Sequence, residues 1–145
     1  MASCVCFCLR ELVSALPAEI VWRPAVPLET CWELCALSGP EAMRLSDTSL
    51  RCHTLLVPEE LYSPAWQARQ VVSYGLSGRS SLTFSSMDRR GLLCVQRALA
   101  DRFGRPVEEQ EVCLPAGWGV FSPQDRLLLA GIWLLYAGAL PIPEK

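Results

Sequence analysis

The second half of the chain most constrains the fold, because short strand-forming stretches there lead into one capped, apolar helix. The segment Ser122-Pro-Gln-Asp125 combines a serine cap, a proline at the first helical position and an acid in the first turn. The residues that follow are almost all apolar, and Gly138 and Pro141 are typical of a helix end. We therefore predict a helix over Leu127–Leu140, buried in a core or against a partner.

Short apolar or β-branched runs bounded by turn residues predict the strands. The expected strands are Ser3–Leu9, Ile20–Arg23, Leu50–Val57, Val71–Tyr74, Ser80–Ser86, Leu92–Leu99 and an edge strand at Glu108–Leu114. Two further helices are expected. One is short and covers Arg10–Leu16, ahead of Pro17. The other covers Leu28–Leu37, where apolar residues recur at helical spacing and Gly39-Pro40 ends the run.

A length of 145 residues fits one domain. The elements above predict a single α/β domain over residues 1–145, with a small mixed sheet, packed helices and a hydrophobic C-terminal helix. Short connections between the later strands favour a sheet that is partly antiparallel.

The charge pattern argues against a nucleic-acid partner. The formal net charge is -2, and acids such as Asp101 and Glu108 are interleaved with arginines such as Arg97 and Arg102. This pattern is typical of a solvated face of mixed charge. No membrane association is expected, because the apolar run from Leu127 is shorter than the about 20 residues of a membrane span. The N-terminal segment lacks a basic region before its apolar residues, so a cytoplasmic protein is predicted.

Eight cysteines without a clear export signal indicate reduced thiols rather than a disulfide scaffold. An alternative is a metal or redox module. Its candidate residues are Cys4, Cys6, Cys8, Cys31, Cys35 and Cys52. None of these has the C-x-x-C spacing of a zinc knuckle, so no metal ligand and no cofactor is assigned. Buried thiols explain the same positions without a metal.

Candidate residues for chemistry are few, and no catalytic residue is assigned. His53 is the single histidine, and its strand context indicates a hydrogen-bonded structural residue. A small-ligand site is predicted where strand ends and turn amides meet, with a small anion as its ligand. Its residues are Glu59, Tyr74, Gly75, Ser77 and Arg79. An enzyme is therefore less expected than a binding protein.

The leading functional hypothesis is a small non-enzymatic protein that binds a protein partner or itself. The high apolar content, 51%, motivates this hypothesis. Trp118, Trp133 and Tyr136 are its candidate interface anchors, because large aromatic side chains dominate the energetics of interfaces.

The order of predicted strands and helix in the second half of the chain resembles the latter part of the central ATP-binding domain of Mur ligases. The residues that carry this resemblance are Val71–Gly75, Ser80–Ser86, Leu92–Leu99 and the helix that ends at Gly138-Ala-Leu-Pro141. The resemblance covers about half of the chain and implies a degenerate relative of that sheet. The chain has no glycine-rich phosphate loop, and Ser122-Pro-Gln-Asp125 stands where the family has a histidine-asparagine pair. Ligase activity is therefore not carried over to any residue.

Overall fold

The structure is a computed structural model that describes residues 2–7, 10–22, 31–86 and 91–141. Its strands are β1 (Ala2–Phe7), β2 (Val21–Trp22), β3 (Cys31–Leu37), β4 (Leu50–Pro58), β5 (Trp66–Tyr74), β6 (Leu82–Ser86), β7 (Leu92–Val95), β8 (Leu99–Ala100), β9 (Pro106–Val107) and β10 (Gln110–Cys113). Its helices are the 3-10 helices η1 (Arg10–Ala15) and η2 (Ala116–Val120) and the α-helices α1 (Gly39–Arg44) and α2 (Pro123–Ala137).

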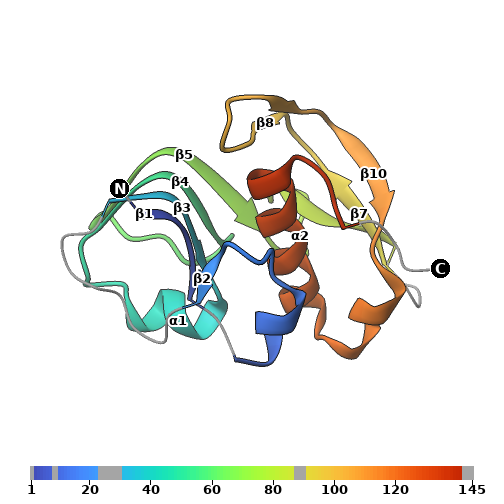
Figure 1. The fold of residues 1–145 in the computed structure, drawn as a ribbon, viewed down its shortest axis with the longest axis horizontal. Helices are drawn as coiled ribbons and strands as arrows, with labels where there is room; N and C mark the ends of the chain where they lie inside the picture. The colour runs from blue at the N-terminus through green and yellow to red at the C-terminus, as the bar shows by residue number, and fades with distance from the viewer. Residues whose placement is uncertain (1, 8–9, 23–30, 87–90, 142–145) are drawn as a thin grey trace.

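Within the described ranges, eight strands form one mixed sheet in the order β10-β7-β6-β5-β4-β3-β1-β2 (Figure 1). The strands from β2 to β6 pair in parallel, and β6, β7 and β10 pair antiparallel. Strands β8 and β9 form a separate antiparallel pair. The predicted α/β domain with a mixed sheet is confirmed, and β10 lies at the sheet edge as expected.

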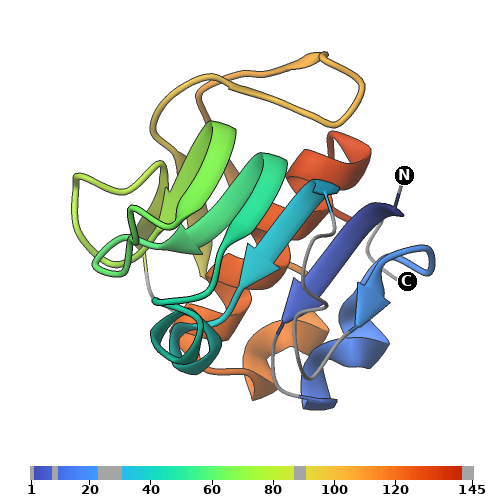
Figure 2. The same cartoon turned by 90° about the vertical axis from the view of Figure 1, so that its left-hand side faces the viewer.

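The parallel strands bring their carboxyl ends to one edge of the sheet. Strands β3, β4 and β5 are neighbours in the sheet, and they lie side by side in Figure 2. The chain returns from β3 to β4 through α1, and from β4 to β5 through residues 59–65. Because Leu56 pairs with Val72 and Pro58 with Tyr74, β4 and β5 end at the same level.

Two groups of buried side chains hold the fold together. The larger group joins α2 to the sheet and includes Leu56, Leu82, Leu128 and Ile132, each 0% exposed. Gly131 lets the helix approach the sheet closely, because a Cβ there would lie 2.7 Å from Leu56 Cδ2. The smaller group packs α1 and the connections on its side of the sheet against β3, β4 and β5. Both sides of the central strands are therefore covered.

The parallel strands are not regular along their whole length. Residues two apart on a regular strand share a face. Yet Trp32 belongs to the smaller buried group and Leu34 to the larger one, so the alternation of β3 changes phase at Glu33. Strand β4 shows a similar change between Cys52 and Leu56. The amino-terminal part of these strands therefore presents a different set of residues to each side.

The predicted helix over Leu28–Leu37 is wrong where the structure describes it, because Cys31–Leu37 is strand β3. Residues 28–30 lie outside the described ranges. A short apolar run fits a buried strand as well as a helix, and pairing with both β1 and β4 selects the strand. Gly39-Pro40 starts α1 rather than ending a helix, since Ser38 caps it and accepts a hydrogen bond from the Glu41 amide.

The predicted start of the C-terminal helix is confirmed. Ser122 is its cap and accepts a hydrogen bond from the Asp125 amide at 3.2 Å. The helix ends at Ala137, earlier than predicted, because Gly138 adopts a left-handed conformation with φ of 79°. Among the described helices, none has the length and apolarity required to cross a membrane.

Other observed strand and helix boundaries differ from the predicted ones where strand pairing extends or interrupts an apolar run. Strand β5 begins at Trp66 instead of Val71, because β4 pairs with it along its whole length. The predicted strand over Leu92–Leu99 divides into β7 and β8. The predicted helix over Arg10–Leu16 is the 3-10 helix η1, and Trp118 lies in the 3-10 helix η2.

Candidate functional site

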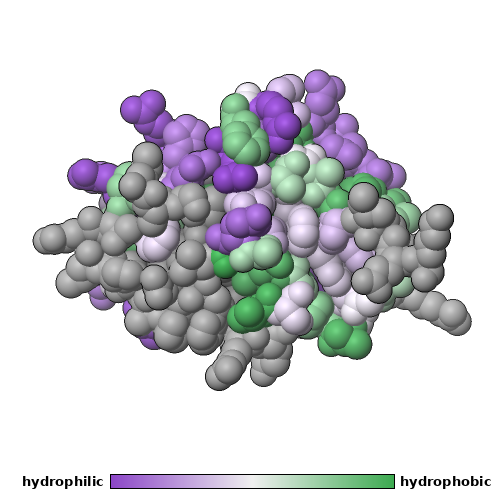
Figure 3. All heavy atoms as spheres, in the orientation of Figure 1, coloured by the Kyte–Doolittle hydropathy of each residue, from purple (hydrophilic) through white to green (hydrophobic). Residues whose placement is uncertain are grey.

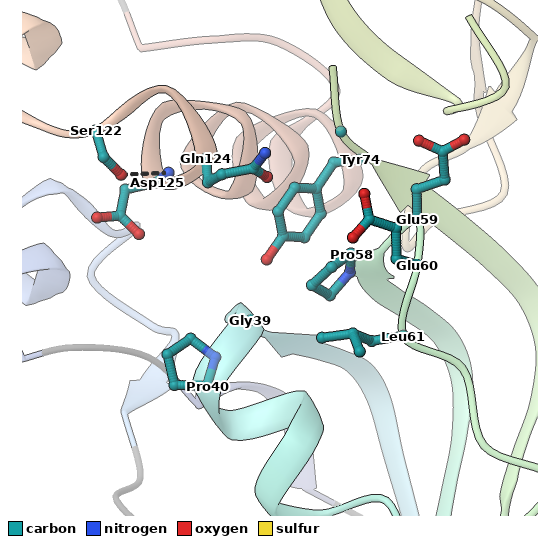
Figure 4. Close-up of a pocket in the computed structure, with 11 residues that line it drawn as sticks. Gly39, Pro40, Pro58, Glu59, Glu60, Leu61, Tyr74, Ser122, Gln124 and Asp125 are labelled. Atoms are coloured by element: carbon teal, nitrogen blue, oxygen red, sulfur yellow. Dashed lines mark hydrogen bonds between the residues drawn. The ribbon is translucent and has the colours of Figure 1, made fainter. Parts of the chain in front are cut away.

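A pocket of about 380 Å³ lies at the carboxyl edge of the parallel strands. Pro58 and Tyr74 reach it from the ends of β4 and β5, and Gly39 and Pro40 from the start of α1. The α2 side contributes Ser122, Gln124 and Asp125, and the connection after β4 contributes Glu59, Glu60 and Leu61 (Figure 4). Two strand ends and two helix starts therefore meet at one place.

Tyr74 is the central aromatic residue of this pocket. Figure 4 shows its ring between the helix α2 and Pro58, with the phenol oxygen directed toward α1. The side chain is 2% exposed, and its hydroxyl donates a hydrogen bond of 2.7 Å to the carbonyl oxygen of Leu37. Since Leu37 is the last residue of β3, this bond ties the end of β5 to the end of β3. Tyr74 thus forms a fixed wall.

Glu59 is held by hydroxyl groups from the turn after β5. Ser77 and Ser80 donate hydrogen bonds to its two carboxylate oxygens, the second at 2.9 Å. These bonds, that of Ser77 first, lower the pKa of Glu59, and the nearby charge of Arg79 lowers it further. Glu59 is therefore a carboxylate at neutral pH, with a geometry that the turn fixes.

Gly75 is required for this arrangement. A Cβ at residue 75 would lie 2.9 Å from Ser80 Oγ and 3.0 Å from Glu59 Oε2. Its amide also donates to the carbonyl oxygen of Leu82, at 3.1 Å. A glycine at the end of β5 thus allows the carboxylate of Glu59 and its serine partner to lie against the backbone.

The lining of the pocket is acidic. Three of the described residues that line it carry a carboxyl group, namely Glu59, Glu60 and Asp125, and none of these described residues is Lys, Arg or His. Pro40, Pro58, Leu61 and the ring of Tyr74 supply apolar surface beside these groups. The arrangement favours a ligand that combines a positive charge with an apolar part, because two or three nearby carboxylates repel an anion.

The residues of the predicted ligand site come together in this region. Glu59, Tyr74 and Gly75 line the pocket. Ser77 does not line the pocket but donates a hydrogen bond to Glu59, which does. The Oγ atom of Ser77 also accepts a hydrogen bond from the Arg79 amide at 3.1 Å. The small anion expected as ligand does not fit the acidic lining. The turn hydroxyls that would have met it are already bonded to a carboxylate.

The proposed interface anchors require a correction. Trp118 and Tyr136 are buried, at 6% and 8% exposure, and both belong to the larger buried group. Trp133 packs against the same group, and its Nε1 donates to the carbonyl oxygen of Ala15 at 2.8 Å. Trp118 and Tyr136 are therefore core residues, and Trp133 is partly buried against the same core.

The described cysteines do not assemble a metal site. Among the described residues, no group of three or more His, Cys, Asp and Glu side chains is placed to hold a metal ion. Cys31 is exposed, whereas Cys35 and Cys52 are buried. A hydrogen bond with Cys52, together with burial, raises the pKa of the Cys35 thiol. The side chains of Cys4 and Cys6, and all of Cys8, lie outside what the structure describes.

His53 lies on the exposed amino-terminal part of β4 rather than in the core. Its Nδ1 lies 3.1 Å from the hydroxyl oxygen of Thr54, within hydrogen-bonding distance. The expectation of a hydrogen-bonded histidine is confirmed, although the site is on the surface. His53 is remote in the sheet from the carboxyl-edge pocket, because it stands five residues before the end of its strand.

The sequence analysis missed the α1 and α2 starts as walls of the pocket. Both carry the same local signal, a serine cap with an acid three residues later, at Ser38 and Glu41 and at Ser122 and Asp125. Reading Ser38-Gly-Pro-Glu41 as a helix start would have placed α1 beside the end of β3. That the two starts meet at Tyr74 depends on the packing of α2 across the sheet.

Comparisons with known proteins identify no relative. No protein-family model matches the chain, and neither a curated protein nor a solved structure matches it closely enough to indicate a relationship. The resemblance to Mur ligases therefore stays a prediction.

Proposed function

We propose that this chain is a small-molecule-binding α/β domain whose site is the pocket at the carboxyl edge of β3, β4 and β5. The observation that carries the proposal is the convergence of Tyr74, Gly75, Glu59 and Glu60 on one cavity, with the carboxylate of Glu60 directed toward the Tyr74 ring (Figure 4). Ligands of open α/β sheets bind outside the carboxyl ends of parallel strands. A preformed cavity with an apolar wall and a few oriented polar groups is the usual form of such a site.

The charges of the lining select the ligand class. Glu59 is anionic and oriented by Ser77 and Ser80, and Glu60 and Asp125 add carboxyl groups on two sides of the pocket. An ammonium group would pair with these oxygens through charge-assisted hydrogen bonds. Pro40, Pro58 and Leu61 offer apolar surface for an alkyl chain in front of the buried ring of Tyr74. The proposed ligand is a small amine with an apolar part.

A titration monitored by amide NMR tests this proposal. The probes are butylamine and putrescine, with butyrate and succinate as anions of matched size, all at constant ionic strength. We expect saturable shifts of the amides of Gly75 and Gln124 with the amines. Saturation by the carboxylates instead, or no saturable shift with any probe, would contradict the proposal.

Charge-neutral variants locate the site. In Glu59→Gln and Glu60→Gln, the affinity for putrescine is expected to fall at least about fivefold, since each removes a charged partner. Glu109→Gln is the matched control, because it removes the same charge at an exposed residue outside the pocket. Equal losses in all three variants would assign the binding to the overall charge and not to the pocket.

A further inference from the structure

A second and larger cavity lies at the opposite, amino-terminal end of the same strands. Its volume is about 730 Å³. Residues from β3, β4 and β5 form one side, and Arg102 and Gly104 from the loop between β8 and β9 form the other. In Figure 3, hydrophilic surface gathers at the left-hand end of the sheet and around the loop beside β8.

The lining of this cavity is basic in an otherwise acidic chain. Arg51, Arg69 and Arg102 line it, and Glu33 is the one acidic residue among the described residues of its lining. Among the described residues, the ion pairs are Arg44 with Glu41 and Arg105 with Asp101, so none of these three arginines is ion-paired there. Three positive charges without an ion-paired carboxylate among the described residues, from three separate segments, repel one another around one space.

The strand register sets where two of the arginines stand. Arg51 pairs with Gln67 across β4 and β5, and Arg69 follows Gln67 by two residues along β5. Both arginines are exposed. Neighbouring strands are about 4.8 Å apart and alternate rows about 6.6 Å apart. These spacings are within the reach of two guanidinium groups that bind a single phosphate or carboxylate group.

Arg102 faces them with a fixed orientation. Its backbone amide donates to the carbonyl oxygen of Leu135 at 2.7 Å, and its Nε donates to that of Tyr136 at 3.0 Å. Its guanidinium carbon lies 4.0 Å from the centroid of the Tyr136 ring and 4.3 Å from that of Phe103. With Nε occupied, the two terminal nitrogens remain to form the paired hydrogen bonds that arginine makes with a carboxylate or phosphate.

From this geometry we infer that the cavity between the amino-terminal half of β3–β5 and the β8–β9 loop is an anion-binding site. Its ligand class is a small polyanion that carries phosphate or carboxylate groups. Arg102 is the pre-oriented contact, and Arg51 and Arg69 close on the ligand from the sheet. The site is independent of the carboxyl-edge pocket, since no residue lines both.

Protection of a cysteine from alkylation tests the inference in the intact protein. Cys31 is exposed and lines the cavity, whereas Cys113 is exposed on β10 outside it and serves as an internal control. Labelling rates with the neutral reagent N-ethylmaleimide are measured for each cysteine by peptide mass spectrometry. The added anion is inorganic pyrophosphate or citrate, at constant ionic strength because salt screens exposed charges.

We expect saturable slowing at Cys31 and unchanged labelling at Cys113. Stronger protection by pyrophosphate than by citrate assigns a phosphate ligand, and the reverse assigns a carboxylate. In Arg51→Gln/Arg69→Gln, the apparent affinity should fall at least about 30-fold, since two charged contacts are lost. The control Arg44→Gln/Arg79→Gln removes the same charge from exposed residues elsewhere and should keep the affinity.

Three results would overturn the inference. These are the absence of protection by either anion, equal slowing at both cysteines, and equal affinities in the two double variants. The Nε–Hε signal of Arg102 in the unmodified protein is a second readout, which depends on no variant. A saturable shift of that signal with the same midpoint as the protection supports the site, and an unchanged signal argues against it.

Discussion

Replacing Gly131 by alanine tests how α2 is seated on the sheet. The glycine is buried in the middle of the helix. An added Cβ would lie 2.7 and 2.9 Å from the two terminal carbons of Leu56 and 3.0 Å from Leu82 Cδ1. Both leucines are 0% exposed, so neither side chain has free space into which to move.

Two opposing effects set the size of the change. Alanine is favoured over glycine in a helix by about 1 kcal/mol. An extra carbon in a filled core costs about 1–3 kcal/mol. We expect the clash to dominate, with the free energy of unfolding lowered by about 1 kcal/mol. The corresponding fall in melting temperature is about 2–4 °C for a chain of this size.

Urea denaturation, monitored by circular dichroism, measures this change in the free energy of unfolding. Gly117→Ala is the control, because a Cβ at that residue has no atom within 4 Å. In the background of Leu56→Val, which shortens the clashing side chain, Gly131→Ala should cost less or become stabilising. The reasoning is refuted if Gly131→Ala stabilises the unaltered protein by about 1 kcal/mol, as in an open helix.

Further predictions concern the cap of α2, the tyrosine of the pocket and the acid response. Ser122→Ala removes the side-chain cap of α2 and should lower the free energy of unfolding by about 1 kcal/mol in urea; an unchanged value would contradict the cap. Tyr74→Phe should cost about 1 kcal/mol in the same assay, through loss of its bond to Leu37. Burial raises the pKa of Asp101, but hydrogen bonds from Arg105 and Phe103 outweigh burial and lower it. The stabilisation by Asp101 is therefore present above its unfolded pKa of about 3.9 and is lost as the pH falls through the lower folded value. Between pH 7 and pH 3, the free energy of unfolding should fall less in Asp101→Asn than in the unaltered protein. Equal falls in the two proteins would count against this role.

The elements that are set by contacts between residues close together in the sequence could be predicted from the sequence. The start of α2 needs a serine, a proline and an acid within one turn, and all of these contacts are local. Strand β4 was predicted almost completely, because its apolar residues are bounded by a proline and its β-branched residues favour extended backbone. The predicted ligand residues Glu59, Tyr74 and Gly75 lie together at one pocket, because each follows or ends a strand and strand ends carry a recognisable pattern of turn residues.

Long-range packing decided what the local pattern left open. Cys31–Leu37 has a spacing that suits a helix, and it is a strand because β1 and β4 provide hydrogen-bonding partners on both sides. Trp118 and Tyr136 were predicted as interface anchors, and they are core residues because η2 and α2 place them in the larger buried group. The basic cavity has no signal in the chain order, since Arg102 follows Arg69 by more than thirty residues.

The sequence by itself therefore determined the α/β class, the capped helix and the strand ends, because short-range sterics, capping and hydrophobic pattern act over a few residues. Only the tertiary structure decided the sign of charge at each end of the sheet. Acidic side chains from the β4 connection and α2 meet at one edge, and arginines from β4, β5 and the β8–β9 loop meet at the other. Such meetings depend on strand order and helix packing, which no local pattern encodes.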